Sequence, residues 1–168
     1  MHTAVPYDPG LWTSFFSAEV SASASLTGLV FVAVSINLKQ IVGMRQLVAR
    51  AAKALLTLAV ILAISILCLV PDVTRGTLGA ELAALSVAYW LLGVWLHTRT
   101  ATTNRFASQT AKRFQLIVTQ LSTLPLVGAA LSLLGGHGGG LYWMVAGTLM
   151  SFFSALIDGW VLLIEILR

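Results

Sequence analysis

The order of apolar and polar residues divides this chain of 168 residues into five long apolar stretches joined by shorter polar segments. The apolar stretches cover, in order, residues 11–38, 51–70, 78–96, 114–134 and 141–167. A helix rises about 1.5 Å per residue, so each stretch is long enough to cross about 30 Å of hydrocarbon. The pattern therefore predicts an all-α fold, a polytopic bundle of five transmembrane helices in a single domain that spans residues 1–168.

Proline and glycine mark the expected ends of these helices. Asp8 and Pro9 have the order of an N-cap and a first-turn proline for the first helix, and Pro71 follows the second helix. The run GGHGGG at 135–140 has the glycines of a phosphate-binding loop but lacks the Lys and the Ser or Thr that should follow them. We expect this run to form a flexible turn on the outer side of the membrane.

Composition agrees with a membrane domain. Hydrophobic residues make up 58% of the chain and charged residues 10%, whereas soluble domains are about 45–50% apolar. The first Lys or Arg is Lys39, so the positive region of a cleavable signal peptide is missing, and we expect the first apolar stretch to remain as a helix. Cys68 has no second cysteine with which to form a disulfide.

The basic residues lie almost wholly on one side of the alternating topology. Apart from Arg75 they are Lys39, Arg45, Arg50 and Lys53 in the first loop, Arg99, Arg105, Lys112 and Arg113 in the third, and Arg168 at the C-terminus. Because Lys and Arg are enriched in cytoplasmic loops, this predicts an outer N-terminus and a cytoplasmic C-terminus. The net charge of +4 comes from these short loops, which favours anionic lipid headgroups over nucleic acid as partners.

Small and hydroxylated residues follow one side of the first apolar stretch. Ser21, Ser25, Gly28 and Ser35 are spaced by three, four and seven residues, which places them on one helix face. In lipid, small residues allow close approach of two helices, so one interpretation is a packing seam that includes Gly28. The other interpretation is that the hydroxyls of Ser21, Ser25 and Ser35 line a narrow polar path, within one chain or at the axis of an oligomer.

The last apolar stretch has a similar face, formed by Gly147, Ser151, Ser154 and Asp158, of which the first three are a second candidate seam. Asp158 lies roughly 10 Å inside the expected boundary, where a carboxylate costs on the order of 3 kcal/mol and needs protein or water around it. Counting inward along the helices places Gln120 and Thr123 at a similar depth. These residues are candidates for an ion or proton site; alternatively, Gln120 and Thr123 hold Asp158 only to fix the helix register.

Acidic residues on the other side suggest a mouth for cations. Glu19 and Glu81 fall near the expected outer boundary, and acids gathered at an opening concentrate cations. The alternative is that these charges are scattered over separate loops. None of the histidines is at ligand spacing to another ligand, and no nucleophile motif is present, so we expect no metal site, no cofactor and no enzyme.

Two segments, SASASLTGLVFVAVSINL at 21–38 and ALIDGWVLLIEILR at 155–168, resemble small bacterial multi-helix integral membrane proteins. The resemblance implies a multi-pass protein of the bacterial plasma membrane. It assigns no function to any residue.

The sequence is consistent with two functions. The first is a homo-oligomeric membrane assembly with a polar path that passes ions or small solutes, because the two polar faces and Asp158 stand in a chain otherwise nearly free of charge. The alternative is a non-conducting accessory or regulatory subunit whose seams dock on a larger bacterial membrane complex.

Overall fold

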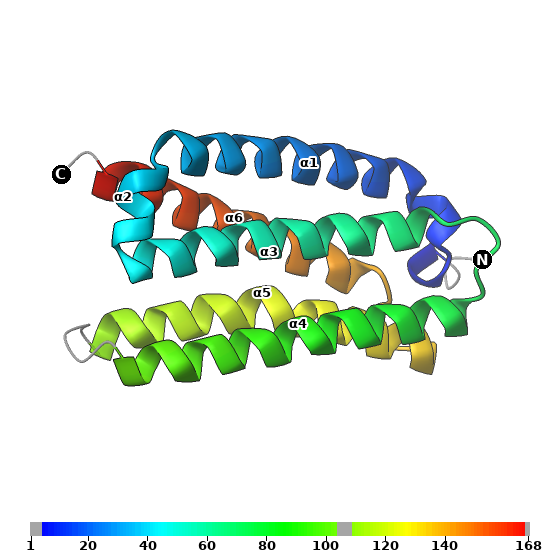
Figure 1. Cartoon of the computed structure of the whole chain (residues 1–168). Helices are drawn as coiled ribbons and strands as arrows, with labels where there is room; N and C mark the ends of the chain where they lie inside the picture. Colours follow the sequence, from blue (N-terminus) through cyan, green and yellow to red (C-terminus); the bar gives the residue numbers. More distant parts are fainter. Residues whose placement is uncertain (1–4, 104–108, 167–168) are drawn as a thin grey trace. The chain divides into compact units, whose positions relative to one another are not determined.

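The computed structural model describes the backbone of residues 5–103 and 109–166, and the side chains of 5–44, 47–95 and 116–162. Within these residues the protein is helical and has no strands (Figure 1). Two short 3-10 helices, η1 (Val5–Tyr7) and η2 (Pro9–Trp12), precede the α-helices. These are α1 (Thr13–Ile36), α2 (Leu38–Gly43), α3 (Arg45–Leu69), α4 (Arg75–Thr103), α5 (Gln109–Gly135) and α6 (Tyr142–Ile166).

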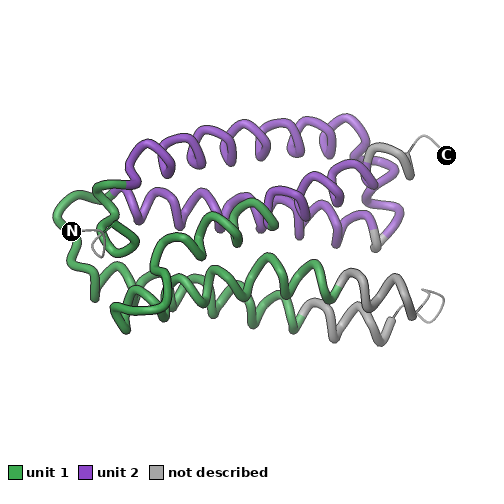
Figure 2. The backbone as a smooth tube through the Cα atoms, turned by 180° about the vertical axis from the view of Figure 1, so that it is seen from behind, with its two compact units in different colours: residues 1–11, 70–150 green, residues 12–69, 151–168 purple. Residues whose placement is uncertain are grey.

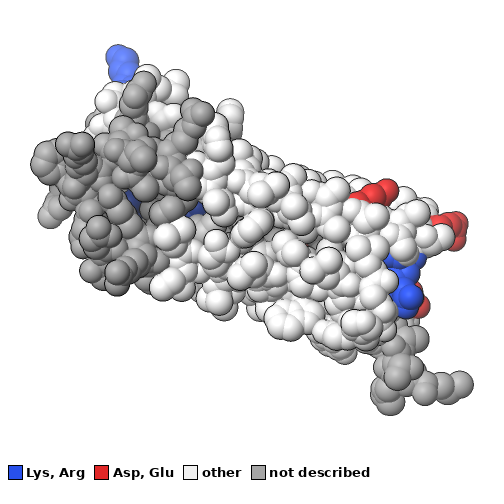
Figure 3. Space-filling model, turned by 90° about the horizontal axis from the view of Figure 1, so that it is seen from below, with Lys and Arg blue, Asp and Glu red and all other residues white. Residues whose placement is uncertain are grey.

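Five of these helices are long and apolar enough to span a membrane, as the sequence predicted. Their apolar segments are Pro9–Ile36, Leu47–Leu69, Arg75–Trp95, Leu116–Gly135 and Tyr142–Leu162. The face drawn in Figure 3 shows neither acidic nor basic side chains along the middle of the helices. A surface of this kind is suited to lipid, where an unpaired charge is expensive.

Local chemistry explains where several helices begin and end. Asp8 Oδ1 accepts a hydrogen bond of 3.0 Å from the Gly10 amide at the start of η2, one turn before the α-helix α1 begins at Thr13. Thr74 caps α4, because its hydroxyl accepts a hydrogen bond from the Thr77 amide. The helix α3 ends at Leu69, shortly before Pro71.

The contacts of the chain fall into two compact units, drawn in Figure 2. Unit 1 consists of residues 1–11 and 70–150, which hold α4, α5 and the first part of α6. Unit 2 consists of residues 12–69 and 151–168, which hold α1, α2, α3 and the rest of α6. The single domain expected from the sequence stays a prediction.

In unit 2, α1 and α3 pack side by side along their length and run in opposite directions, with α2 at the turn between them (Figure 1). The turn is set by Asn37, whose carbonyl accepts hydrogen bonds from the Gln40 and Ile41 amides. Beside this turn a small core is formed by Ile41, Leu47, Ala51 and Leu162, with Val34 against it. This core ties α2, α3 and α6 together at one end of the unit.

In unit 1, α4 and α5 form a second antiparallel pair, and the turn after α5 is closed by hydrogen bonds (Figure 1). The Ser132 hydroxyl accepts a hydrogen bond of 2.7 Å from the Gly140 amide and donates to the His137 carbonyl. The Leu141 amide donates to the Pro6 carbonyl over 2.7 Å. A Cβ on Gly140, whose φ is +54°, would overlap that carbonyl. The turn at 135–140 is thus tied to the N-terminal segment, which differs from the flexible turn expected.

Candidate functional site

The most unusual feature of unit 2 is an ion pair inside its membrane-spanning helices. Lys53 of α3 places its Nζ 3.0 Å from Oδ2 of Asp158 on α6. The side chain of Asp158 is only 8% exposed and that of Lys53 is 22% exposed. The Oδ2 atom is fully buried and accepts no well-directed hydrogen bond from the described residues, so its contact with Lys53 is electrostatic.

Hydroxyl groups extend this pair along the same faces of α3 and α6. Ser154 lies one turn before Asp158, and its Oγ is 3.5 Å from the Lys53 ammonium. Ser151 and Thr57 are also buried, and the Thr57 hydroxyl donates to the Lys53 carbonyl over 2.8 Å. Buried hydroxyls therefore lie within one or two turns of the pair on both helices.

A second buried acid lies between α1 and α3. Glu19 is 5% exposed, and its Oε2 accepts a hydrogen bond of 2.9 Å from the Ser65 hydroxyl. Ser23, one turn further along α1, is buried and donates to the Glu19 carbonyl. The next turn carries Thr27, which donates in the same way to the Ser23 carbonyl. Hydroxyls therefore follow Glu19 on α1 in steps of about 6 Å.

The two acids stand at opposite ends of the same stretch of α3. Lys53, which binds Asp158, and Ser65, which binds Glu19, are about 18 Å apart along the helix axis. The side chains between and around them form what we call the buried polar series: Glu19, Ser65, Ser23, Thr27, Thr57, Ser151, Ser154, Lys53 and Asp158. All but Thr27 and Lys53, which are partly exposed, are buried.

The hydroxyl face predicted on the first helix is on its surface. Ser21, Ser25 and Ser35 are exposed, and each hydroxyl donates to the carbonyl four residues earlier on α1. Gly28 is exposed too, and a Cβ built on it meets nothing within 4 Å. Among the residues whose side chains the structure describes, none therefore lies close to Gly28, and the three hydroxyls are satisfied within α1 itself.

The two residues expected beside Asp158 belong to unit 1. Gln120 accepts a hydrogen bond of 2.9 Å from the Trp90 indole, and Thr123 donates to the Thr119 carbonyl of its own helix. Asp158 belongs to unit 2, and the proximity of Gln120 and Thr123 to it stays a prediction.

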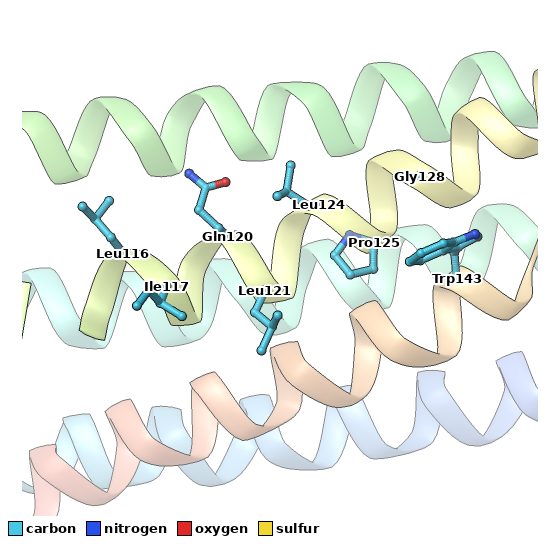
Figure 4. A pocket seen from close by; sticks show the side chains of 8 residues that line it. All are labelled: Leu116, Ile117, Gln120, Leu121, Leu124, Pro125, Gly128 and Trp143. Atoms are coloured by element: carbon cyan, nitrogen blue, oxygen red, sulfur yellow. The ribbon is translucent and has the colours of Figure 1, made fainter. Parts of the chain in front are cut away.

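Gln120 also lines a groove of about 620 Å³ on unit 1, seen in Figure 4. The groove follows α5 past Pro125 as far as Trp143 of α6, and its other linings are Leu116, Ile117, Leu121, Leu124 and Gly128. In Figure 4 the Gln120 side chain points toward α4, whereas Leu121 points to the opposite side of α5. The lining of the groove is thus largely apolar apart from Gln120.

The face of α6 predicted as a seam is used in both units. In unit 1, a Cβ on Gly147 would stand 2.6 Å from Leu126 Cδ2 and 3.2 Å from the Leu126 backbone nitrogen. The absence of a side chain thus permits close packing of α5 and α6, as expected of a small residue in a seam. In unit 2, Ser151 and Ser154 continue this face and are buried.

The two acids of the expected outer mouth have different surroundings. Glu81 is exposed on α4 in unit 1, whereas Glu19 is buried against Ser65 in unit 2. Glu19 is therefore a binding group inside a helix pair and not a solvated charge on a loop. Among the described residues, no group of three or more His, Cys, Asp or Glu side chains is placed to hold a metal ion.

Several charged side chains lie outside the described ones, namely Arg45, Arg99, Arg105, Lys112, Arg113, Glu165 and Arg168. His2 lies outside the described residues altogether. Of the remaining basic residues, Lys53 differs from the expectation. It was counted with the first loop, but α3 begins at Arg45, so Lys53 stands two turns inside a spanning helix.

Sequence reasoning therefore missed the partner of Asp158. A signal was present, because Lys53 interrupts the apolar run AAKALL and has Thr57 one turn later on the same face. A basic residue in such a run needs an acid nearby in the fold. Ser65 gave no comparable signal, since a serine in a spanning helix needs no partner from another helix: its hydroxyl can bond a backbone carbonyl of its own helix.

Comparisons of this chain with protein-family models, with curated proteins and with solved structures find no match.

Proposed function

We propose that this protein is a homo-oligomeric assembly of the bacterial plasma membrane that passes ions or small solutes along a polar path and performs no enzymatic chemistry. The observation that supports this most is the ion pair of Lys53 and Asp158, buried in spanning helices. Charged side chains at such positions are expensive, and they typically mark ion pathways or proton relays.

The proposed orientation is an outer N-terminus and a cytoplasmic C-terminus, with anionic lipid headgroups at the basic loops. Lys39 and Arg50 lie at the end of unit 2 that holds the ion pair. In this orientation Asp158 is near the cytoplasmic side and Glu19 is toward the outer side. The buried polar series then runs between the two sides of the membrane.

The exposed small residues of α1 are the proposed contact between copies. Buried residues make up only 11% of the apolar segment of α1, compared with 44% for that of α3. The face with Ser21, Ser25, Gly28 and Ser35 consists mostly of small side chains, with the exposed Val32 between Gly28 and Ser35. An identical helix from a second chain fits such a face.

Flux measurements in proteoliposomes test this proposal. Vesicles with the wild-type protein, vesicles with the double variant Lys53→Met/Asp158→Leu, and empty vesicles are compared for the passage of inorganic ions and small neutral solutes. We expect flux with the wild-type protein and a fall toward the empty-vesicle rate with the double variant. No flux of any species with a folded, reconstituted wild-type protein contradicts the proposed class.

The exposure of α1 also favours a second function, that of an accessory subunit. The same face of α1 suits a helix of a larger bacterial membrane complex as well as it suits a copy of itself. Stoichiometric co-purification with a much larger partner, abolished by Gly28→Leu, favours this alternative. Co-purification of identical chains alone favours the first proposal.

A further inference from the structure

We propose that the groove on unit 1 binds one anionic phospholipid of the surrounding bilayer, with an acyl chain along α5 and the headgroup at the basic start of that helix. Every residue that lines the groove belongs to a segment long and apolar enough to span a membrane (Figure 4). An open groove on such helices faces lipid and not water. A lipid site of this kind is independent of any flux through the protein.

The length of the groove matches one leaflet of a bilayer. From Leu116 to Gly128 the groove follows α5 for about 18 Å, and one leaflet has a hydrocarbon depth of about 15 Å. Trp143 closes the far end. Its indole donates a hydrogen bond of 2.7 Å to the Gly138 carbonyl, and a Cβ on Gly128 would stand 3.8 Å from its ring. A lipid tail that enters beside Leu116 therefore fills the groove as far as Trp143.

Gln120 provides a polar group that an acyl chain alone does not satisfy. Its Oε1 accepts a hydrogen bond of 2.9 Å from the Trp90 indole, which can only donate, so the orientation of the amide is fixed. The two hydrogens on Nε2 have no acceptor among the described residues. In lipid an unpaired amide N–H is costly. Gln120 lies about 6 Å inside Leu116, near the border of the hydrocarbon, where the ester carbonyl of a phospholipid can accept from it.

The start of α5 carries the charge that an anionic headgroup requires. Lys112 and Arg113 lie on α5 within about one turn before Leu116, and the sequence of α5 contains no Asp or Glu. Arg113, Ile117 and Gln120 are spaced by four and three residues, which places them on one face of the helix. Lys and Arg at the border of a membrane attract anionic lipids. The basic end, the amide and the apolar groove thus follow the order of headgroup, ester and tail.

The size of the groove favours a lipid over a helix of a second chain. A helix about 10 Å across and about 18 Å long occupies about 1,400 Å³, more than twice the 620 Å³ of the groove. The backbone carbonyls of a helix are also used within it, so they offer the Gln120 amide no acceptor. A single acyl chain with its ester group meets both conditions.

Native mass spectrometry tests the site. The full chain is released from nanodiscs of phosphatidylglycerol and phosphatidylcholine in equal parts, with identical acyl chains. We expect the wild-type chain to retain one lipid, with phosphatidylglycerol preferred by about tenfold. Leu121→Trp, which fills the groove, should abolish retention. Leu131→Trp, at a similarly exposed position of α5 outside the groove, should not.

Charge variants test the position of the headgroup. Lys112→Gln/Arg113→Gln should remove the preference for phosphatidylglycerol while a lipid is still retained. Lys39→Gln/Arg50→Gln removes the same charge from the first loop and should keep the preference. Equal effects of the two double variants would show general attraction of the basic loops for anionic lipid, which contradicts a headgroup at the start of α5.

The amide has its own control. Trp90→Phe/Gln120→Leu removes both partners of the hydrogen bond and should reduce retention severalfold, whereas Trp90→Phe alone keeps the Gln120 amide and should not. Retention of both lipids in the nanodisc ratio by the wild-type chain, or equal retention by folded Leu121→Trp and Leu131→Trp, contradicts the site. A dimer without lipid that Leu121→Trp separates assigns the groove to contact between copies instead. If Leu121→Trp does not fold, the charge and amide variants decide the question.

Discussion

Two opposite charges meet at 3.0 Å in unit 2, where both side chains are largely withdrawn from solvent. Taking an ion out of water costs several kcal/mol, and only close contact with its partner offsets the loss. Removal of one partner therefore has a different effect from removal of both. Replacing both partners with apolar residues of similar size removes this cost, because neither a buried charge nor an unsatisfied donor remains.

Single and double substitutions at this pair should thus differ in stability. We expect Lys53→Met to lower the free energy of unfolding by about 3 kcal/mol, because Asp158 is left buried without its partner. We expect Lys53→Met/Asp158→Leu to be within about 1 kcal/mol of the wild-type protein. Denaturant titration in mixed micelles, followed by helix content, measures both values. Equal losses for the single and double variants would show that the pair is not coupled.

At the scale of single residues, the sequence identified Asp158 but not its partner Lys53. Asp158 stands out, because a carboxylate deep in an apolar stretch requires a partner. The identity of that partner depends on which turn of α3 faces α6, and the count of residues from an assumed boundary placed Lys53 in a loop. The partner of Glu19 was also missed, while its place at an outer mouth stays a prediction. Its distance from the boundary is visible in the sequence, but the hydroxyl of Ser65 that meets it comes from a helix that runs the other way.

Among the elements, α1 and α3 show which properties of a helix can be predicted from its pattern of apolar residues. Both were predicted from length and apolar content, and both are present. The boundary of α3 differs by about two turns, because Arg45, Arg50 and Lys53 lie within the helix. Lys53 is tolerated there because it pairs with Asp158. The sequence did not show which face of α1 is buried, because small residues occur both on the exposed face and on the face with Ser23.

The contact of α5 with α6 in unit 1 allows a test of the predicted seam. Gly147→Leu should lower the free energy of unfolding by about 2–3 kcal/mol, since its Cβ alone would stand 2.6 Å from Leu126 Cδ2. Gly28→Leu is the matched control, because a Cβ at this exposed glycine meets nothing within 4 Å. We expect the control to change stability by less than about 0.5 kcal/mol. The same denaturant titration measures both, and an equal loss at Gly28 would contradict the different roles of the two glycines.

For the whole molecule, the sequence indicates a membrane protein and the structure divides it into two units that share α6. Hydrophobic length alone specifies the number of spans, because lipid imposes the same requirement on each helix. It does not specify which helices pair, since apolar side chains pack equally well on many partners in a bilayer. The division therefore depends on particular contacts, such as those of Glu19 with Ser65 and of Lys53 with Asp158.

Assembly is the property that belongs to the molecule as a whole, and α1 is the element that should control it. Its face with Gly28 at the centre is exposed among the described residues and suits close contact with an identical helix. We therefore expect native mass spectrometry of the protein in lipid nanodiscs to show a closed ring of identical chains. Gly28→Leu should shift the population to smaller species, because the added side chain separates the helices.

Ala84→Leu, which places the same side chain at an exposed position of α4, should leave the mass of the assembly unchanged. A mass that corresponds to one copy bound to a much larger complex would assign the α1 face to a host protein and support the accessory function. A wild-type monomer would contradict both assignments of this face. The unfolding data for Gly28→Leu distinguish loss of assembly from loss of fold, because the variant chain by itself is expected to be as stable as the wild-type chain.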